Sequence, residues 1–168
     1  MEMLGQNSKT IFLGQAIKYP GTSMSSTFAK VSRNKLLEFP VEEDLQMGVS
    51  IGLAVKGYIP ISIFPRWNFL LLAANQLVNH LDKLESLIGD TNTPKVIVRT
   101  SVGSVNPLHP GPQHDGDFTE AFTLLCPNIN IVKLETKEMI YMEYEKALLR
   151  TDGKSTILVE LSDKNHLK

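Results

Sequence analysis

The chain has 168 residues, 42% of them hydrophobic, which is enough for one domain with a sizeable core but too few for two ordinary domains. Its 17 basic and 18 acidic residues nearly cancel, which excludes the strong positive field that draws nucleic acid or anionic lipid to a protein. The longest apolar run, 69–74, is far below the roughly 20 residues that span a bilayer, so we expect a soluble protein.

The single cysteine and the N-terminal segment indicate in which cellular compartment the protein is expected. Cys126 is the only cysteine, which excludes an internal disulfide framework and a zinc site built from thiolates. The N-terminus lacks the basic-then-apolar pattern of a secretory signal, and segment 1–6 is typical of the end of a helix. We therefore expect a reducing, cytoplasmic location.

Strand-like and helix-like segments alternate along the chain. Short β-rich apolar runs predict five strands, at 10–13, 58–64, 95–99, 128–133 and 155–160. Helical patterns predict helices at 43–56, 67–87, roughly 117–125, and 137–150. This alternation is typical of βαβ units, so we predict an α/β fold: a three-layer α/β/α sandwich with a mainly parallel sheet.

Two segments without clear periodicity are predicted to be long loops. Segment 18–37 is rich in serine and threonine and has room for one short helical turn. Segment 101–116 is rich in glycine and proline and carries His109 and His114 directly after a strand, where open α/β sheets present their ligand-binding loops. Ligand chemistry is expected there, and no composition shift marks a domain boundary anywhere in 1–168.

The acidic start of the helix at 43–56 is a candidate site. Glu42, Glu43 and Asp44 open a helix that is otherwise almost entirely apolar and must be largely buried. Acids in a first turn are ordinary because they complement the positive end of the helix. However, helical spacing puts Glu43 on one side with Gln46, Met47 and Ser50, so that its carboxylate could project beside an apolar surface toward a ligand.

Other candidate residues each have an ordinary alternative. Phe64, Trp67 and Phe69 could offer a flat surface to a heteroaromatic ring, although any one of them could equally be core. His114 could exchange protons with a ligand, or be an exposed loop histidine. Histidines and carboxylates show no metal-ligand spacing, and the glycines form no phosphate-cradling motif, so we expect no metal ligands in this chain.

Several short segments, taken in order, carry a resemblance to a known family. They are Pro40-Val41-Glu42-Glu43, Gly48, Gly52-Leu53-Ala54, Gly57, Phe64, the run 69–79 and Gly111-Pro112-Gln113-His114. Together they resemble the pyrimidine-binding domain of the transketolase and 2-oxo acid dehydrogenase beta-subunit family of thiamine-diphosphate enzymes. The resemblance spans about residues 10 to 160. It implies a single pyrimidine-binding domain over 1–168, with neither a diphosphate-binding domain nor a C-terminal transketolase-type domain.

The resemblance implies roles for particular residues. Glu43 would hydrogen-bond a ring nitrogen of the cofactor's aminopyrimidine and favour the imino tautomer, whose exocyclic nitrogen deprotonates the thiazolium carbon to give the reactive ylide. His114 would lie beside the reacting carbon, and Phe69 would stack on the pyrimidine. Phe64, Trp67 and Gln15 would complete the cofactor-binding surface, with Gln15 standing where the family usually has an acidic residue.

The same resemblance implies a cofactor and a partner. The cofactor would be thiamine diphosphate with Mg²⁺, and a diphosphate-binding, alpha-type partner subunit would hold the diphosphate and the metal. The chain would then be inactive alone and would work in a homo- or hetero-oligomer on a small-molecule carbonyl substrate, as a 2-oxo acid decarboxylase or dehydrogenase beta-subunit does. Two alternatives stay open: a split transketolase-like ketol transferase subunit, and a non-catalytic partner-binding paralogue.

Overall fold

The fold is built around one parallel sheet. The computed structural model describes residues 1–89, 94–103 and 109–162, and within these residues six strands form a sheet in the order β2-β1-β3-β4-β6-β5. The strands are β1 (Thr10–Gly14), β2 (Leu36–Glu38), β3 (Ile59–Ile63), β4 (Ile97–Val102), β5 (Asn130–Leu134) and β6 (Thr156–Leu161). Every neighbouring pair is parallel, which confirms the predicted α/β class.

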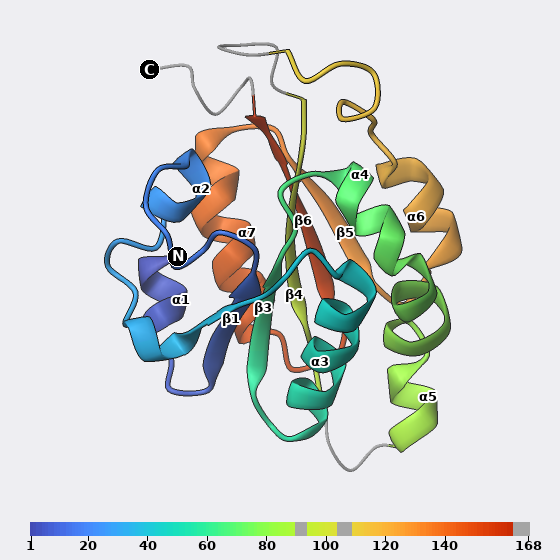
Figure 1. Ribbon diagram of the computed structural model, residues 1–168. Helices are drawn as coiled ribbons and strands as arrows, with labels where there is room; N and C mark the ends of the chain where they lie inside the picture. Colours follow the sequence, from blue (N-terminus) through green and yellow to red (C-terminus); the bar gives the residue numbers. More distant parts are fainter. Residues whose placement is uncertain (90–93, 104–108, 163–168) are drawn as a thin grey trace.

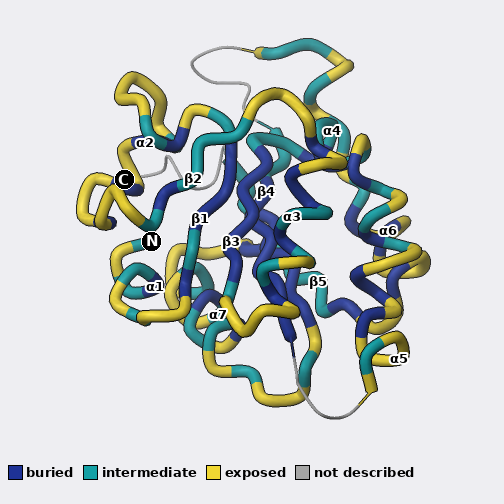
Figure 2. The backbone as a smooth tube through the Cα atoms, turned by 60° about the horizontal axis from the view of Figure 1, so that its bottom comes forward, coloured by how far each residue is buried: buried dark blue, intermediate teal, exposed yellow. Residues whose placement is uncertain are grey.

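Helices cover both faces of this sheet (Figure 1). One face carries α1 (Glu2–Gln6), α2 (Ser23–Ser26) and α7 (Lys137–Leu149), and the other carries α3 (Glu43–Val55), α4 (Trp67–Leu70), α5 (Leu84–Ile88) and α6 (Thr119–Leu125). Parallel strands need such crossovers and are buried on both sides as a result. Figure 2 shows β3 and β4 buried at the centre, with the exposed residues on helices and loops. The three-layer prediction is thereby confirmed.

Two elements differ from the predictions. The segment expected to be a loop, 18–37, ends in the short edge strand β2, which pairs with β1. The helix expected over 67–87 is instead broken into α4, a 3₁₀ turn at Leu71–Ala73, a π-helical segment at Gln76–Leu81, and α5. In the π segment the Asp82 amide donates to the carbonyl of Leu77 at 2.9 Å, five residues back rather than four.

The strand order places a topological switch point at one end of the sheet. From β1 the chain goes to β2 on one side and returns to β3 on the other side of β1. The loops that leave the carboxyl ends of β1 and β3 therefore separate, and ligands of open α/β sheets bind at this kind of position. No helix among the described residues is long and apolar enough to cross a membrane.

The close approach of β1 and β3 at this switch point depends on Gly14. A Cβ at Gly14 would lie 3.0 Å from the carbonyl oxygen of Ile63 and 3.1 Å from Cγ2 of Ile17. We expect Gly14→Ala to lower the free energy of unfolding by about 1–3 kcal/mol because the added methyl group would push the end of β1 away from the end of β3. Gly52→Ala is the control. Gly52 lies on the exposed side of α3, where an added Cβ would meet nothing within 4 Å, and the substitution should raise the free energy of unfolding by about 0.5–1 kcal/mol. Urea unfolding measures both, and an unchanged Gly14→Ala would contradict the close approach.

Candidate functional site

Three consecutive acidic residues at the start of α3 differ in how far they are buried. Glu42 and Asp44 are exposed, whereas Glu43 is only 3% exposed. The predicted helix side is confirmed, because Gln46, Met47 and Ser50 are buried together with Glu43. The loop from β2 leads into this turn beside the end of β1, and Glu43 is the one acid of the three that is buried there.

Glu43 has a single neutral partner among the described residues. The Nε2 amide of Gln15, the residue that follows β1, donates to Oε1 of Glu43 at 3.0 Å. No described lysine, arginine or histidine lies within ion-pair distance of the Glu43 carboxyl group. Burying an unpaired carboxylate is costly, so a carboxyl group retained in this setting indicates function more than stability.

A second carboxylate fixes the turn that carries Gln15. Ala16 adopts φ 54°, a left-handed conformation that costs energy for any residue with a side chain. Glu38, the last residue of β2, holds this turn: its carboxylate accepts hydrogen bonds from the Ala16 amide and, at 2.9 Å, from the Lys18 amide. No sequence pattern singled out Glu38, because its strand was not predicted.

An aromatic and an imidazole ring meet beyond β3 and β4. The ring centroids of Phe69, in α4, and His114 lie 5.4 Å apart, with the planes inclined by 31°. Both side chains are partly exposed, and the His114 Nδ1 atom is buried with no hydrogen-bond partner in the described parts of the chain. The structure therefore brings together two predicted site residues that are 45 positions apart, and leaves one imidazole nitrogen without a hydrogen-bond partner among the described residues.

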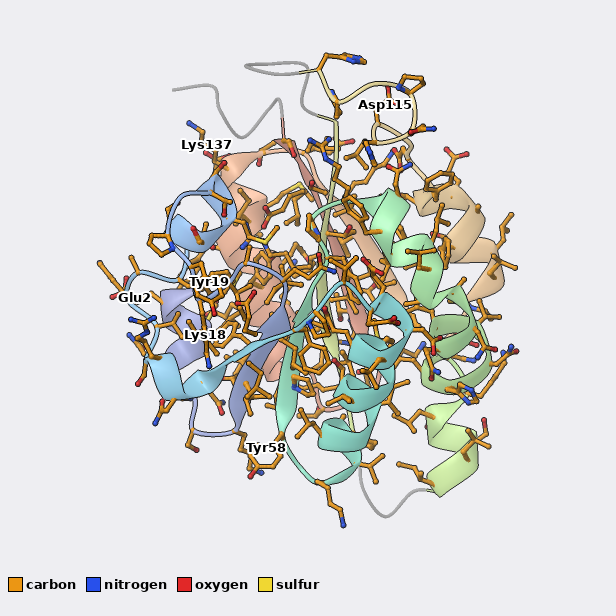
Figure 3. All side chains as sticks on the ribbon, viewed as in Figure 1. Glu2, Lys18, Tyr19, Tyr58, Asp115 and Lys137 are labelled. Carbon is orange, nitrogen blue, oxygen red and sulfur yellow. The ribbon has the colours of Figure 1, made fainter. Side chains whose placement is uncertain are left out.

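Arg66 holds the segment that carries His114. Its Nη1 donates to the carbonyl of Gly103 at 2.7 Å and to the carbonyl of His114 at 3.0 Å. Figure 3 shows Asp115, the next residue, at the end of the molecule where the strands finish. One guanidinium group thus fixes both ends of the loop, and sequence patterns did not predict this role.

Removing Arg66 should loosen the loop without unfolding the domain. We expect Arg66→Ala to raise amide hydrogen exchange in segment 109–116 by about tenfold, because hydrogen bonds from a charged donor contribute about 1.5–3 kcal/mol. Arg33→Ala, at an exposed position, is the matched control and should leave exchange in this segment unchanged. Exchange measured by mass spectrometry that is equal in the two variants would contradict the role of Arg66.

The other predicted site residues, Phe64 and Trp67, and the loop residue His109 differ from Phe69 in how far they are exposed. Phe64 and Trp67 are 1% and 0% exposed and pack in the core beneath α4, so they support the site from below and present no face to solvent. His109 is exposed, and its Nδ1 accepts a hydrogen bond from the Gly111 amide at 3.0 Å.

Burial raises the pKa of the Cys126 thiol to about 11, with a further contribution from Asp82, so this thiol is not a nucleophile at neutral pH.

The fold and this site define an α/β domain with a parallel sheet, in which a buried carboxyl group and a partly exposed aromatic surface lie at the carboxyl edge of the sheet. Residues 1–165 match the family model described as the transketolase, pyrimidine binding domain. The chain belongs to this family, which confirms the resemblance seen in the sequence.

Individual relatives agree with the family. The chain is 30% identical over 135 residues to the pyruvate dehydrogenase E1 component subunit beta of Gracilaria tenuistipitata var. liui, covering 78% of this chain and 41% of the relative. It is 23% identical over 120 residues to the 3-methyl-2-oxobutanoate dehydrogenase subunit beta of Mycobacterium tuberculosis H37Rv, covering 71% and 33%. The chain thus spans about two fifths or less of the length of these curated relatives.

A solved structure supports the fold independently. A protein described as a split gene transketolase, inactive beta4 tetramer, superposes with a TM-score of 0.70 at 19% sequence identity, over 95% of this chain and 47% of that one. At this identity the similarity shows the fold alone.

Proposed function

We propose that the chain is the pyrimidine-binding part of a heteromeric thiamine-diphosphate enzyme, most similar to a 2-oxo acid decarboxylase or dehydrogenase beta subunit. One observation carries the proposal: Glu43 is a buried carboxyl group at the carboxyl edge of the sheet whose one hydrogen-bond partner among the described residues is a neutral amide. Membership of the family supplies the cofactor class.

The chain's own groups fit an aminopyrimidine ring. With Oε1 occupied by Gln15, Oε2 of Glu43 is the oxygen that would share a proton with a ring nitrogen. Phe69 offers a partly exposed ring for stacking, and His114 packs against it, where it would hold or move a proton near the substrate. The cofactor itself, when bound, would supply the nucleophilic carbon that attacks a substrate carbonyl.

The remaining parts of the enzyme would come from a partner. Among the described residues no cluster of three histidine, cysteine or acidic side chains could hold a metal ion. Following the family resemblance, we assign the diphosphate and Mg²⁺ to an alpha-type partner subunit and propose that the enzyme is cytoplasmic and inactive without this partner. Exposed apolar side chains near Glu43 and Phe69 favour such an interface: Val41 is 71%, Leu45 52% and Leu72 63% exposed.

Calorimetry tests the proposal. Thiamine diphosphate with Mg²⁺ is titrated into the chain alone, into a candidate diphosphate-binding subunit alone, and into their mixture. We expect tight binding in the mixture and, at most, weak binding in the separate proteins, because each holds only one half of the cofactor. Binding by the mixture that is no stronger than by the partner alone would contradict the proposal and favour a non-catalytic, partner-binding role.

His114 should affect the reaction more than cofactor binding. In the assembled enzyme we expect His114→Ala to lower kcat by about 10²-fold or more while the cofactor affinity changes little, because its imidazole would act at the reacting carbon. His109→Ala, in the same loop but exposed, is the control and should keep full turnover. Loss of cofactor affinity with unchanged kcat would reject this role for His114.

A further inference from the structure

Gln46 is a buried amide placed between α3 and the sheet. It is 0% exposed and lies one helical turn after Glu43, on the same side of the helix. Burying an uncharged amide costs free energy unless its polar atoms find partners. The partners that Gln46 finds are therefore informative about why this residue is there.

The Gln46 side chain is bound to the ends of two strands. Its Nε2 donates to the carbonyl of Ile63 at 3.0 Å and to the hydroxyl of Ser62 at 3.0 Å, and it lies 3.4 Å from the carbonyl of Leu13. Ser62 and Ile63 end β3, whereas Leu13 lies near the end of β1. One amide thus connects α3 to both strands at the switch point.

The same strand end also contacts Glu43. Leu13 is followed by Gly14 and then by Gln15, whose amide donates to Oε1 of Glu43. Two glutamine amides therefore link the first turns of α3 to the end of β1, one at Glu43 itself and one a turn further on. Rotation or sliding of α3 against the sheet would have to break the Gln46 contacts before it could move the Glu43 carboxyl group.

The anchoring has a measurable cost. The Gln46 Oε1 atom is buried and accepts no hydrogen bond from any described residue. An unsatisfied buried acceptor costs about 1–3 kcal/mol, and an apolar side chain of similar shape would avoid this cost. Stability alone therefore does not explain an amide at this position.

We propose that Gln46 is a positioning residue, which sets the position of the Glu43 carboxyl group by anchoring α3 to the carboxyl ends of β1 and β3. The inference rests on the proposed function only in giving Glu43 its role toward the cofactor. The anchoring itself can be tested in the chain without any cofactor.

The first test observes Gln15 by NMR in the 168-residue chain. Gln46→Met keeps the shape but removes the donor, and should move the Gln15 side-chain amide signals toward those of a free glutamine amide. Ser50→Ala is the matched control: it deletes another buried hydrogen bond of α3, from the Ser50 hydroxyl to the Gln46 carbonyl at 2.8 Å, and should leave the Gln15 signals unchanged. Ser62→Ala removes one acceptor of Gln46 and should produce a smaller shift in the same direction, which keeps the test usable if Gln46→Met folds poorly.

Unchanged Gln15 signals in both Gln46→Met and Ser62→Ala would overturn the proposal. Equal shifts in Ser50→Ala would also overturn it, because they would mean that any loss of packing in α3 disturbs the site. Unfolding measurements on the same variants separate stability from position, since a purely structural Gln46 would change the free energy of unfolding without affecting Gln15.

The second test uses the assembled enzyme. We expect Gln46→Met to lower kcat by about a hundredfold with little change in the KM of the substrate, because small displacements of a catalytic group have effects of this size, whereas Ser50→Ala should keep kcat. If Glu43→Gln loses turnover while Gln46→Met keeps it, the positioning role fails and the proposed function stands. If Glu43→Gln keeps turnover, the proposed function itself fails.

Discussion

Glu43→Gln should lower the turnover of the assembled enzyme by about 10²–10⁴-fold, the range typical of a lost acid–base group. Glutamine has nearly the same shape and still accepts the hydrogen bond from Gln15, but it cannot share a proton with a ring nitrogen. The change therefore removes the chemistry and leaves the packing. Steady-state kinetics of the assembled enzyme, with the cofactor saturating, measure the effect.

The neighbouring residue provides an internal control. Glu42→Gln makes the same chemical change one position earlier, where the side chain is exposed, and should leave kcat unchanged. Loss of turnover in Glu42→Gln alone would mean that the acid has been assigned to the wrong position. Full turnover in both variants would identify a non-catalytic paralogue.

Glu160→Gln should lower the free energy of unfolding by about 3–5 kcal/mol, the cost of leaving a buried charge without its partner. Arg99 donates to Glu160 from Nε and Nη2, both at 2.9 Å, and the Tyr144 hydroxyl donates to the same carboxylate at 2.9 Å. Burial opposes the charge of Arg99, but Glu160 outweighs it and raises the pKa of Arg99. Burial, and then Glu160, raise the pKa of Tyr144 well above its usual value.

An exposed ion pair is the control for this prediction. Asp152→Asn breaks the pair between Asp152 and Arg150, in which the aspartate is 49% exposed, and should cost less than about 1 kcal/mol. Urea unfolding of both variants measures the difference. Equal effects would contradict the view that burial, and not pairing alone, makes the cluster of Arg99, Glu160 and Tyr144 important.

The strands and the sheet class followed from the sequence because buried parallel strands are short continuous apolar runs. Residues 59–63 and 156–161 are of this kind, and the apolar runs predicted at 58–64 and 155–160 locate them within one residue at each end. The edge strand β2 was not predicted because only three residues, Leu36–Glu38, pair with β1, and they follow a polar stretch. The break in the helix after Trp67 was not predicted because the buried residues keep a spacing of three or four positions throughout the segment, so the pattern carries no signal for where the hydrogen bonding changes. These residues are Leu70, Ala73, Leu77, Leu81 and Leu84.

The site was predictable in part. Glu43 stood out by its place at the start of an apolar helix, and its burial now distinguishes it from Glu42 and Asp44. Contacts between distant segments could not be inferred, since they depend on the topology of the sheet. The pairing of Phe69 with His114 and the anchoring by Arg66 are of this kind.

The two buried aromatics show the limit of composition as a guide. Phe64 and Trp67 come within five residues of Phe69 and have the same stacking chemistry, yet they are buried in the core, and the Phe69 ring is the one that is partly exposed. The direction of each side chain depends on where β3 ends and α4 begins. The sequence predicted three aromatic residues close together along the chain but could not say which ring is exposed.

The most direct measurement is a crystal structure of the chain assembled with a diphosphate-binding subunit, thiamine diphosphate and Mg²⁺. We predict the aminopyrimidine ring at the carboxyl ends of β1 and β3, with a ring nitrogen within hydrogen-bond distance of Glu43 and the ring stacked on Phe69. A cofactor bound entirely within the partner, with Glu43 still contacted only by Gln15, would contradict the account.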